Sequence, residues 1–519
     1  MLLLPPWEGY DEFAHYSYAQ QLADTGTAPS LQEGRLSTDV EAYRRATPTP
    51  YSTTPPFDEN EGWTYRQWFG RDTTPRTHVH VQPLTSRAFS PGEASNWQAQ
   101  HPPLYYSLLA PLVAQTAGLS WAGQLLVLRL ASWTVAFAGF AVSILATRHL
   151  LRRRFPDLER DFFLISGAWA LVFPGFFPEF ARLGNDSLVL LLLGLAWAVL
   201  LRRALSPMHW AWYGLLGILL GLGALTKVTF LPVAVAALAW LGWLGWRCGG
   251  SGERWRTWGG ALLAGLLFAL FSAGWYLRNL LERGSLTGLV ELSEEGTGGA
   301  LFWLNAFAHP FELIKGLLGM LMTFVWGASA SSAYPPVWSV LPLVLPVLVL
   351  LPLSLLLLRR PASEAVVLAL LMVGAVGAGL VYYLLVRVAA TGVGAGAPGW
   401  YLHTLVGPLS LLLAGGWSLI RERVRLAPLL ARVWIGYAFC FCLTVAWLQL
   451  ALFSGCAFKT AERRIYSFDD VSCLGELPRL YANLDTLAYP AAGLALSFLV
   501  AAMMVLAWRW RDRRSLEPR

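Results

Sequence analysis

The feature that most limits the fold is a succession of long apolar runs separated by short polar stretches. By hydropathy these runs cover approximately residues 124–148, 161–180, 185–203, 209–226, 228–246, 258–277, 337–357, 364–386, 402–420, 432–453 and 489–508. A helix of about 20 apolar residues crosses the hydrocarbon core of a bilayer. With 55% hydrophobic and 14% charged residues, the chain differs from soluble globular proteins. We predict an all-α polytopic membrane protein with about eleven transmembrane helices.

Arginine clusters between the runs predict the orientation. They lie at 152–160, 202–203, 247–256, 359–360, 421–425 and 509–514, and in the predicted topology all fall on one side. The positive-inside rule identifies that side as the cytoplasm, so residues 1–123, 278–336 and 454–488 lie outside. The net charge of +7 therefore reflects topology and implies no nucleic-acid partner.

The same pattern divides the chain into four regions. These are an exofacial loop with an acidic motif and interfacial helices (1–123), a first transmembrane group (124–277), an exofacial loop with interfacial helices (278–336), and a second transmembrane group (337–519) that contains the exofacial loop 454–488. The run that begins at His101 is interrupted by Pro111 and predicts a helix along the interface. Only MLLL precedes the first loop, so we expect a further apolar helix ahead of Met1.

The stretch PPWEGYDEFAHYSY, from Pro5 to Tyr18, places adjacent carboxylates just before the first membrane run. Asp11 and Glu12, with His15 four residues after Asp11, suit the general base of a membrane-embedded active site. The alternative is an ordinary helix start in which Asp11 is the N-cap.

Further polar residues recur at the predicted exofacial helix ends: Asn185, Asp186, Lys227, Arg278 and Asn279. A single Lys or Arg at this depth commonly extends its charge to the membrane surface. Together, Lys227 and Arg278 are suited to bind a lipid-linked phosphate, which needs fixed cations at the bilayer edge.

Five motifs taken in order resemble one family: YDEFAH, QHPPLYYSLL, PEFARLGNDSL, LTKVTFLP and WYLRN. They are similar to motifs of GT-C glycosyltransferases of the bacterial protein mannosyltransferase and aminoarabinose transferase type. The resemblance implies a GT-C membrane fold with about eleven helices, a polyprenyl-phosphate-linked sugar as donor and transfer outside the cytoplasmic membrane. It matches Asp11 to the family's first acidic residue, and Lys227 and Arg278 to positions near the lipid phosphate.

One motif departs from the family. Relatives often have Gly-Arg-Tyr before a late helix, whereas this chain has Gly399, Trp400 and Tyr401. His403 and Arg387 are the candidates to replace the missing cation.

The resulting hypothesis is an inverting glycosyltransferase with Asp11 as base and Lys227 and Arg278 as phosphate ligands. Glu12 is the second catalytic candidate, and the residues assigned to substrate binding are His15, His101, Asn185, Asp186, Tyr401 and His403. The activated donor requires no metal or other cofactor in principle, no metal ligand is assigned, and a role for a divalent metal stays open. The acceptor is a protein, a lipid or a glycan. The alternatives are a transporter or flippase of lipid-linked sugars and a non-catalytic membrane scaffold.

Cysteine and histidine positions add two smaller expectations. Cys456 and Cys473 share one exofacial loop, where a disulfide and two unpaired thiols are both open. His78 and His80 lie two residues apart in THVHV and, without a third ligand nearby, are interpreted as part of a solvated strand.

Overall fold

The structure is a computed structural model that describes residues 4–30, 33–46, 65, 88–288, 300–331, 334–360, 363–394, 398–459, 466–468 and 475. Its elements, in chain order, are α1 (Glu12–Thr25), β1 (Arg35–Ser37), α2 (Thr38–Ala46), β2 (Pro91–Ser95), η1 (Trp97–Gln100), α4 (Leu104–Gln115), α5 (Trp121–Arg154), η2 (Pro156–Leu158), α6 (Glu159–Gly167), α7 (Trp169–Val172), α8 (Phe176–Ala181), α9 (Asp186–Leu205), α10 (Trp210–Ala224), α11 (Phe230–Arg247), α12 (Ser251–Arg283), α14 (Ala300–Ala308), α15 (Pro310–Val325), α16 (Val337–Ser354), η3 (Leu355–Arg359), α17 (Glu364–Thr391), η4 (Gly399–Leu405), α18 (Val406–Arg423), α19 (Ala427–Phe453), β3 (Ala457–Lys459) and β4 (Tyr466–Phe468).

The prediction of an all-α polytopic membrane protein is confirmed. In the described part of the chain, eight helical segments are long and apolar enough to cross a membrane: Trp121–Arg154, Asp186–Leu205, Phe230–Arg247, Ser251–Glu282, Val337–Arg359, Glu364–Thr391, Gly399–Arg423 and Ala427–Phe453. The described strands form only two antiparallel pairs, β1 with β2 and β3 with β4.

Three of the eleven predicted runs do not appear among these eight segments. Run 161–180 is broken into α6, α7 and α8, because Pro174 cannot donate a backbone hydrogen bond and Gly175 donates to Val325 O at 2.8 Å instead. Run 209–226 becomes α10, whose 15 residues span about 22 Å, less than the bilayer core. Run 489–508 lies outside the described residues.

Small residues bring the helices of the bundle together. A Cβ atom on Gly217 of α10 would lie 2.5 Å from the carbonyl oxygen of Ala264 in α12, and one on Gly221 would lie 2.7 Å from Phe271 Cβ. Gly194 of α9 is equally close to the backbone of Gly139 in α5, at 2.6 Å. These positions hold glycine because the backbones touch there.

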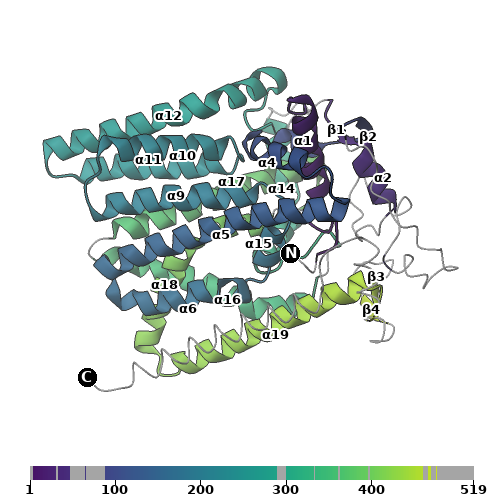
Figure 1. Cartoon of the computed structure of the whole chain (residues 1–519). Coiled ribbons are helices and arrows are strands. Elements are labelled where there is room, and N and C mark those ends of the chain that lie inside the picture. Colours follow the sequence, from purple (N-terminus) through teal and green to yellow (C-terminus); the bar gives the residue numbers. More distant parts are fainter. Residues whose placement is uncertain are drawn as a thin grey trace.

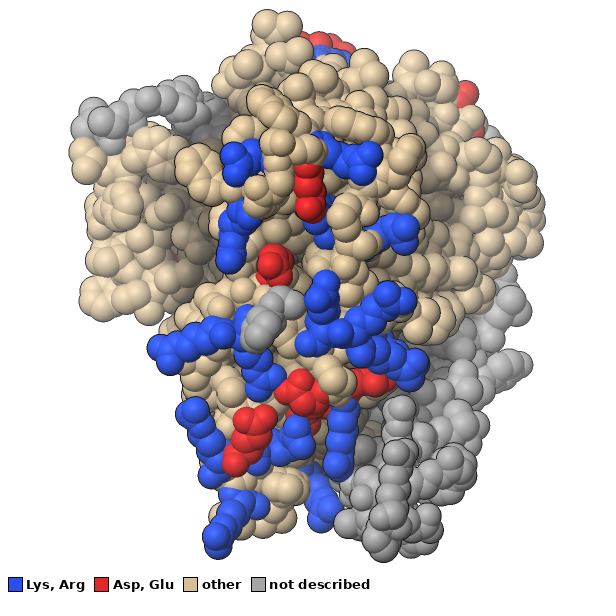
Figure 2. All heavy atoms as spheres, turned by 90° about the vertical axis from the view of Figure 1, so that its left-hand side faces the viewer, with Lys and Arg blue, Asp and Glu red and all other residues tan. Residues whose placement is uncertain are grey.

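The two ends of the bundle differ in composition. Figure 1 shows the amino-terminal elements α1, β1, β2, α2 and α4 gathered at one end of the bundle, on the right of the view. The face at the other end is covered with Lys and Arg side chains, with a few acidic side chains between them (Figure 2). Ion pairs tie this second end together, among them Arg421 with Asp161 at 3.0 Å and Arg203 with Glu253 at 3.0 Å.

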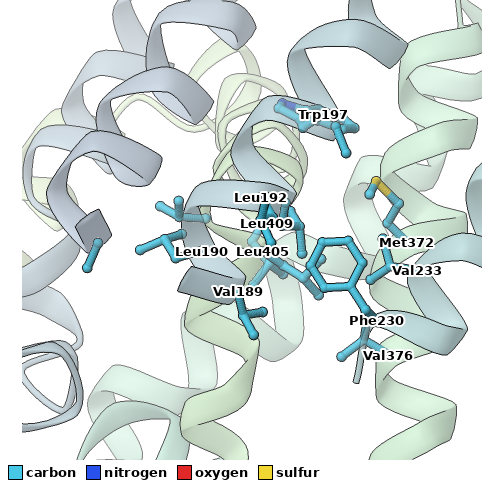
Figure 3. Close-up of a cluster of buried hydrophobic side chains, with 14 of the residues drawn as sticks. Val189, Leu190, Leu192, Trp197, Phe230, Val233, Met372, Val376, Leu405 and Leu409 are labelled. Carbon is cyan, nitrogen blue, oxygen red and sulfur yellow. The ribbon is translucent and has the colours of Figure 1, made fainter. Parts of the chain in front are cut away.

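A dry core lies under the amino-terminal end of α9. Figure 3 shows Val189, Phe230, Val376 and Leu405 converging from α9, α11, α17 and η4. Each of these four side chains is at most 3% exposed. The same helices carry polar residues at their ends, so this core fixes the positions of the polar residues described next.

The structure describes four of the five cysteines. Cys456 is disulfide-bonded, whereas Cys248, Cys440 and Cys442 are free. Cys473 lies outside the described residues, as do His78 and His80, so the Cys456–Cys473 pairing stays a prediction.

Candidate active site

Asp11 occupies an unusual backbone position at the start of α1. Its φ of 57° and ψ of 10° are left-handed, a conformation that non-glycine residues rarely adopt. Asp11 is the N-cap residue of α1 by position, but its carboxylate makes no capping hydrogen bond to the helix. Instead, the side chains of Trp97 and Gln98 in η1 donate hydrogen bonds to it. The backbone therefore directs the carboxylate away from its own helix.

Two cations lie close enough to Asp11 to influence its ionisation. Burial raises the pKa of Asp11, while the charges of Arg182 and Lys227 and the hydrogen bonds from Trp97 and Gln98 oppose that rise. A carboxylate with a raised pKa is a stronger base than one in water, provided that nearby cations keep it ionised.

Arg182 follows α8 and connects three segments of the chain. Its Nη2 donates to Glu179 Oε1 at 2.6 Å, and its Nη1 donates to the backbone oxygen of Tyr10 at 2.7 Å. A Cβ on Gly9 would lie 2.5 Å from Arg182 Cβ, so only glycine lets the Asp11 loop pass this close. Arg182 is 4% exposed.

Lys227 lies in the turn between α10 and α11. Its Nζ contacts both carboxylate oxygens of Asp186, at 2.8 and 2.7 Å, and lies 3.7 Å from the centre of the Tyr401 ring. Burial lowers the pKa of Lys227, and the charge of Asp186 opposes that effect. The ring of Phe230 packs where a Cβ of Gly223 would be, which allows the tight turn that presents the lysine.

Glu179 and Asp186 join these cations into one network. Arg182 Nη2 also contacts Asp186 Oδ2 at 3.4 Å, so the two carboxyl groups share this nitrogen. Burial, opposed by the Arg182 charge and reinforced by Asp186, raises the pKa of Glu179 to about 7. Arg182 and Lys227 therefore bind a buried pair of carboxyl groups, and the charges of both cations also act on Asp11.

Glu12 is placed differently from its neighbour Asp11. It is fully buried, and its oxygens accept from Arg129 Nε at 2.7 Å, from Arg129 Nη2 at 2.5 Å and from the Leu183 amide at 2.9 Å. Arg129 also holds the backbone oxygens of Leu4 and Pro5, at 2.6 and 2.9 Å. Glu12 thus joins the Asp11 loop to α5 and to the start of α9.

A second carboxylate, Glu8, joins the same loop to the segment after α15. It accepts from Tyr65 Oη at 2.6 Å, from Ser331 Oγ at 2.5 Å and from Ser329 Oγ at 2.9 Å. The residues of the described chain that are not glycine and have positive φ are Trp7, Asp11 and Ala328, all in these two joined segments. Their strained backbones are held in place by the Glu8 contacts.

His15 and His101 lie beside the charged network. His15 Nδ1 is 2.8 Å from Tyr106 Oη, and the two imidazole rings stack with centroids 6.4 Å apart. Burial, followed by the Lys227 charge, lowers the pKa of His101 to about 3, and burial likewise lowers the pKa of His15. Both rings are neutral at physiological pH and are suited to hydrogen bonding with a polar ligand.

Of the remaining candidate residues, Asn185 and Tyr401 lie at the charged network and His403 does not. Asn185 is buried next to Asp186, and its amide donates to Thr226 O at 3.4 Å. Tyr401 covers Lys227, and the adjacent Trp400 stacks on Tyr10 at 5.1 Å. His403, by contrast, packs among the aromatic rings of Phe176, Phe324, Trp169 and Phe173, away from the ionic contacts.

Arg278 lies at the edge of this region. It is exposed on α12 and pairs with Glu282 one turn later, at 2.9 Å. Its charge lowers the pKa of Tyr18, although burial raises that pKa more strongly. Arg387, the other candidate cation, donates to Tyr383 Oη at 3.3 Å on the same face of α17.

Sequence reasoning missed Glu179 and Arg182, although both stand in the quoted motif PEFARLGNDSL. Glu179 falls inside the predicted run 161–180, and a carboxylate inside an apolar run is a recognised sign of function. Arg182 is three residues later, a spacing at which opposite charges meet on a helix. These two signals together could have identified the pair.

No family model matches this chain, and no curated protein matches it. Two matching solved structures are of ArnT from Cupriavidus metallidurans. The form bound to undecaprenyl phosphate is 13% identical, with a TM-score of 0.41, and the match covers 88% of this chain and 72% of that one. The apo form is 14% identical, with a TM-score of 0.31, covering 81% and 75%. At these scores the superpositions are loose, and the function proposed next rests on this chain's own residues.

Proposed function

We propose that the chain is an inverting glycosyltransferase of the GT-C type. It moves a sugar from a polyprenyl-phosphate carrier to an acceptor hydroxyl on the outer face of the cytoplasmic membrane. The observation that carries this proposal is the carboxylate of Asp11, which makes no capping bond to its own helix and is under the electrostatic influence of Arg182 and Lys227, with Arg182 bound to the neighbouring Tyr10 carbonyl at 2.7 Å. A base next to two cations is the arrangement needed to activate a hydroxyl and stabilise a departing phosphate.

The proposed step moves one proton and one pair of electrons. Asp11 accepts the proton of the acceptor hydroxyl as that oxygen bonds to the anomeric carbon. The bond from the anomeric carbon to the phosphate oxygen breaks, and its electrons stay on the phosphate. A negative charge thus moves from Asp11 to the phosphate, so fixed cations beside both groups favour the transition state.

Lys227 and Arg182 are the proposed phosphate ligands, with Arg278 as an outer cation at the edge of the site. Both inner cations are buried and are held by carboxylates, which limits their movement. Glu12 is proposed to position the Asp11 loop, because its oxygens are already occupied by Arg129 and by a backbone amide. His15, His101, Asn185 and Tyr401 are proposed to contact the sugars.

The arginine-rich end supports the proposed orientation. The Lys and Arg side chains cover the end of the bundle away from α1 (Figures 1 and 2). The positive-inside rule would place that end in the cytoplasm and Asp11 outside.

The direct test replaces Asp11 with Asn, which keeps the shape of the side chain and removes the base. Purified protein in liposomes is supplied with a panel of polyprenyl-phosphate sugars, and transfer to acceptor lipids or peptides is measured. We expect Asp11→Asn to bind the donor normally and to lose at least about 10²-fold in rate.

The matched control is Asp24→Asn, the same change at the exposed end of α1, where the carboxylate accepts from the Phe89 amide. It should transfer at the wild-type rate. Near-normal transfer by Asp11→Asn would refute the base assignment. Absence of transfer from every donor by the wild-type protein would refute the enzyme assignment.

A further inference from the structure

The charge of the buried network is poorly matched to a phosphate ligand. Asp11, Glu179 and Asp186 carry three negative charges when ionised, and Arg182 and Lys227 carry two positive charges, leaving −1 (2 − 3). A donor phosphodiester adds another negative charge. Such an excess in a buried site is costly unless one of the carboxyl groups is neutral.

The geometry indicates which carboxyl group is protonated most easily. The side chains of Glu179 and Asp186 are each 3% exposed, and both contact Arg182 Nη2, at 2.6 and 3.4 Å. Two buried carboxylates that share one cation repel each other, so a further negative charge favours protonation of one of them. Asp186 has both oxygens on Lys227 Nζ, at 2.8 and 2.7 Å, which favours its ionised form. Glu179 is therefore the carboxyl group that takes up the proton.

We propose that Glu179 takes up a proton when a lipid-linked phosphate binds, and that it is the positioning residue that makes Arg182 and Lys227 available to that phosphate. This inference rests on the proposed function. A neutral Glu179 still accepts from Arg182 but no longer neutralises it. With a neutral Glu179, the site that holds the phosphate has the same net charge of −1 as the empty, ionised site, whereas an ionised Glu179 would leave −2.

The surroundings of Glu179 place this change near neutral pH. The charged and titratable groups that face it are Arg182 beside it, Asp186 at the start of α9, Lys227 in the α10–α11 turn and Tyr401 in η4. Burial raises its pKa to about 7, with the Arg182 charge opposing and the Asp186 charge adding to the rise. Phosphate binding raises that pKa further, which is the thermodynamic counterpart of proton uptake.

The experiment counts protons during binding of a probe whose own charge is fixed. Undecaprenyl methyl phosphate is a phosphodiester and carries one negative charge throughout the neutral range. Titration calorimetry of the full chain in nanodiscs, in buffers of different ionisation enthalpy, gives the protons taken up per bound probe. We expect uptake approaching one proton at about pH 8, and binding about tenfold weaker at about pH 8 than at about pH 6.

Glu179→Gln supplies the matched variant, because an amide can donate to Asp186 and accept from Arg182 as a protonated Glu179 does. It should bind the probe with no proton uptake and with the same affinity at both pH values. Asp11→Asn removes the carboxyl group of raised pKa on which the charges of Arg182 and Lys227 also act, and it should keep the uptake. Glu422→Gln, an exposed change in α18 at the arginine-rich end, should behave like wild type.

Each outcome decides a separate question. Binding by the wild-type protein without proton uptake overturns the role of Glu179 and leaves the proposed enzyme intact. A folded Glu179→Gln that loses binding at every pH also overturns it, because the ionised carboxylate would then be required. No binding of the probe by wild type at any pH contradicts the proposed donor site itself. If Glu179→Gln fails to fold, the wild-type proton count decides alone.

Discussion

Two glutamate–arginine pairs of similar length behave in opposite ways at the two ends of the bundle. Arg152 pairs with Glu159 at 2.8 Å, and their side chains are 54% and 24% exposed. Arg182 pairs with Glu179 at 2.6 Å, and their side chains are 4% and 3% exposed. At the first pair, desolvation raises the pKa of Glu159, but the hydrogen bonds and charges of Arg152 and Arg148 together outweigh it and lower that pKa. At the second, burial outweighs the ion pair and raises the pKa of Glu179.

The comparison shows that the length of an ion pair does not indicate its role. In water, each partner is solvated and either one can be lost at little cost. In a buried site, each partner depends on the other, and the protonation state becomes adjustable. The arginine-rich end uses its charges for orientation, whereas the end with Asp11 is suited to chemistry.

The largest expected effect is the difference between replacing Arg182 and replacing Arg152 with alanine. Arg182→Ala leaves Glu179 and Asp186 without a shared partner, so we expect it to destabilise the fold by about 3 to 5 kcal/mol and to abolish transfer. Arg152→Ala should change stability by less than about 0.5 kcal/mol and leave transfer unchanged. Thermal unfolding in detergent, followed by a transfer assay on the folded fraction, measures both. Equal effects of the two substitutions would break the comparison.

A smaller effect is expected for Arg278, which is at the Asp11 end but is exposed. Its pair with Glu282 resembles those of the arginine-rich end, with side chains 52% and 49% exposed. If it attracts the donor from the membrane surface, Arg278→Ala should raise the KM for the donor by roughly three- to tenfold and leave kcat nearly unchanged. Arg278→Lys should restore most of the loss. A fall in kcat as large as that of Asp11→Asn would instead place Arg278 at the reacting phosphate.

The smallest effect on transfer is expected at Cys456, whose disulfide is proposed to join Cys473. Breaking a disulfide across a loop of this size lowers the free energy of unfolding by about 2 to 4 kcal/mol. We expect the loss to affect the loop more than the bundle. Cys456→Ser should therefore make residues 454–488 more sensitive to proteolysis and change transfer by less than about twofold. Mass spectrometry of unreduced peptides checks the pairing, and two free thiols would rule it out.

The sequence predicted the helices well where a segment is one uninterrupted apolar run. Long runs such as 364–386 become single helices because apolar helices satisfy all their own backbone bonds in lipid. Run 161–180 had suitable hydropathy, but Pro174 and the contact of Gly175 with Val325 interrupt it. That contact joins residues far apart in the sequence, and hydropathy contains no information about it.

The sequence predicted residues of the candidate site where a polar residue stands at the end of a predicted helix. Asp11, Asp186 and Lys227 are polar residues at helix ends, and the structure brings them into one network. Glu179 and Arg182 lay within or next to a run interpreted as a span, so their pairing was missed. His403 is a polar residue near a helix end that packs among aromatic rings instead. The direction of a side chain in a short helix such as η4 depends on tertiary contacts.

The contacts of Glu8 have a consequence for how the protein is made. Its carboxylate is held by Ser329, 321 positions later in the chain. At synthesis rates of about 5 to 20 residues per second, roughly 15 to 65 s pass before that partner leaves the ribosome. During this interval the loop of Asp11 lacks the Glu8 contacts to Ser329 and Ser331 that help to hold its strained backbone. The proposed site is therefore completed only after four of the eight spanning segments in the described part of the chain have been made.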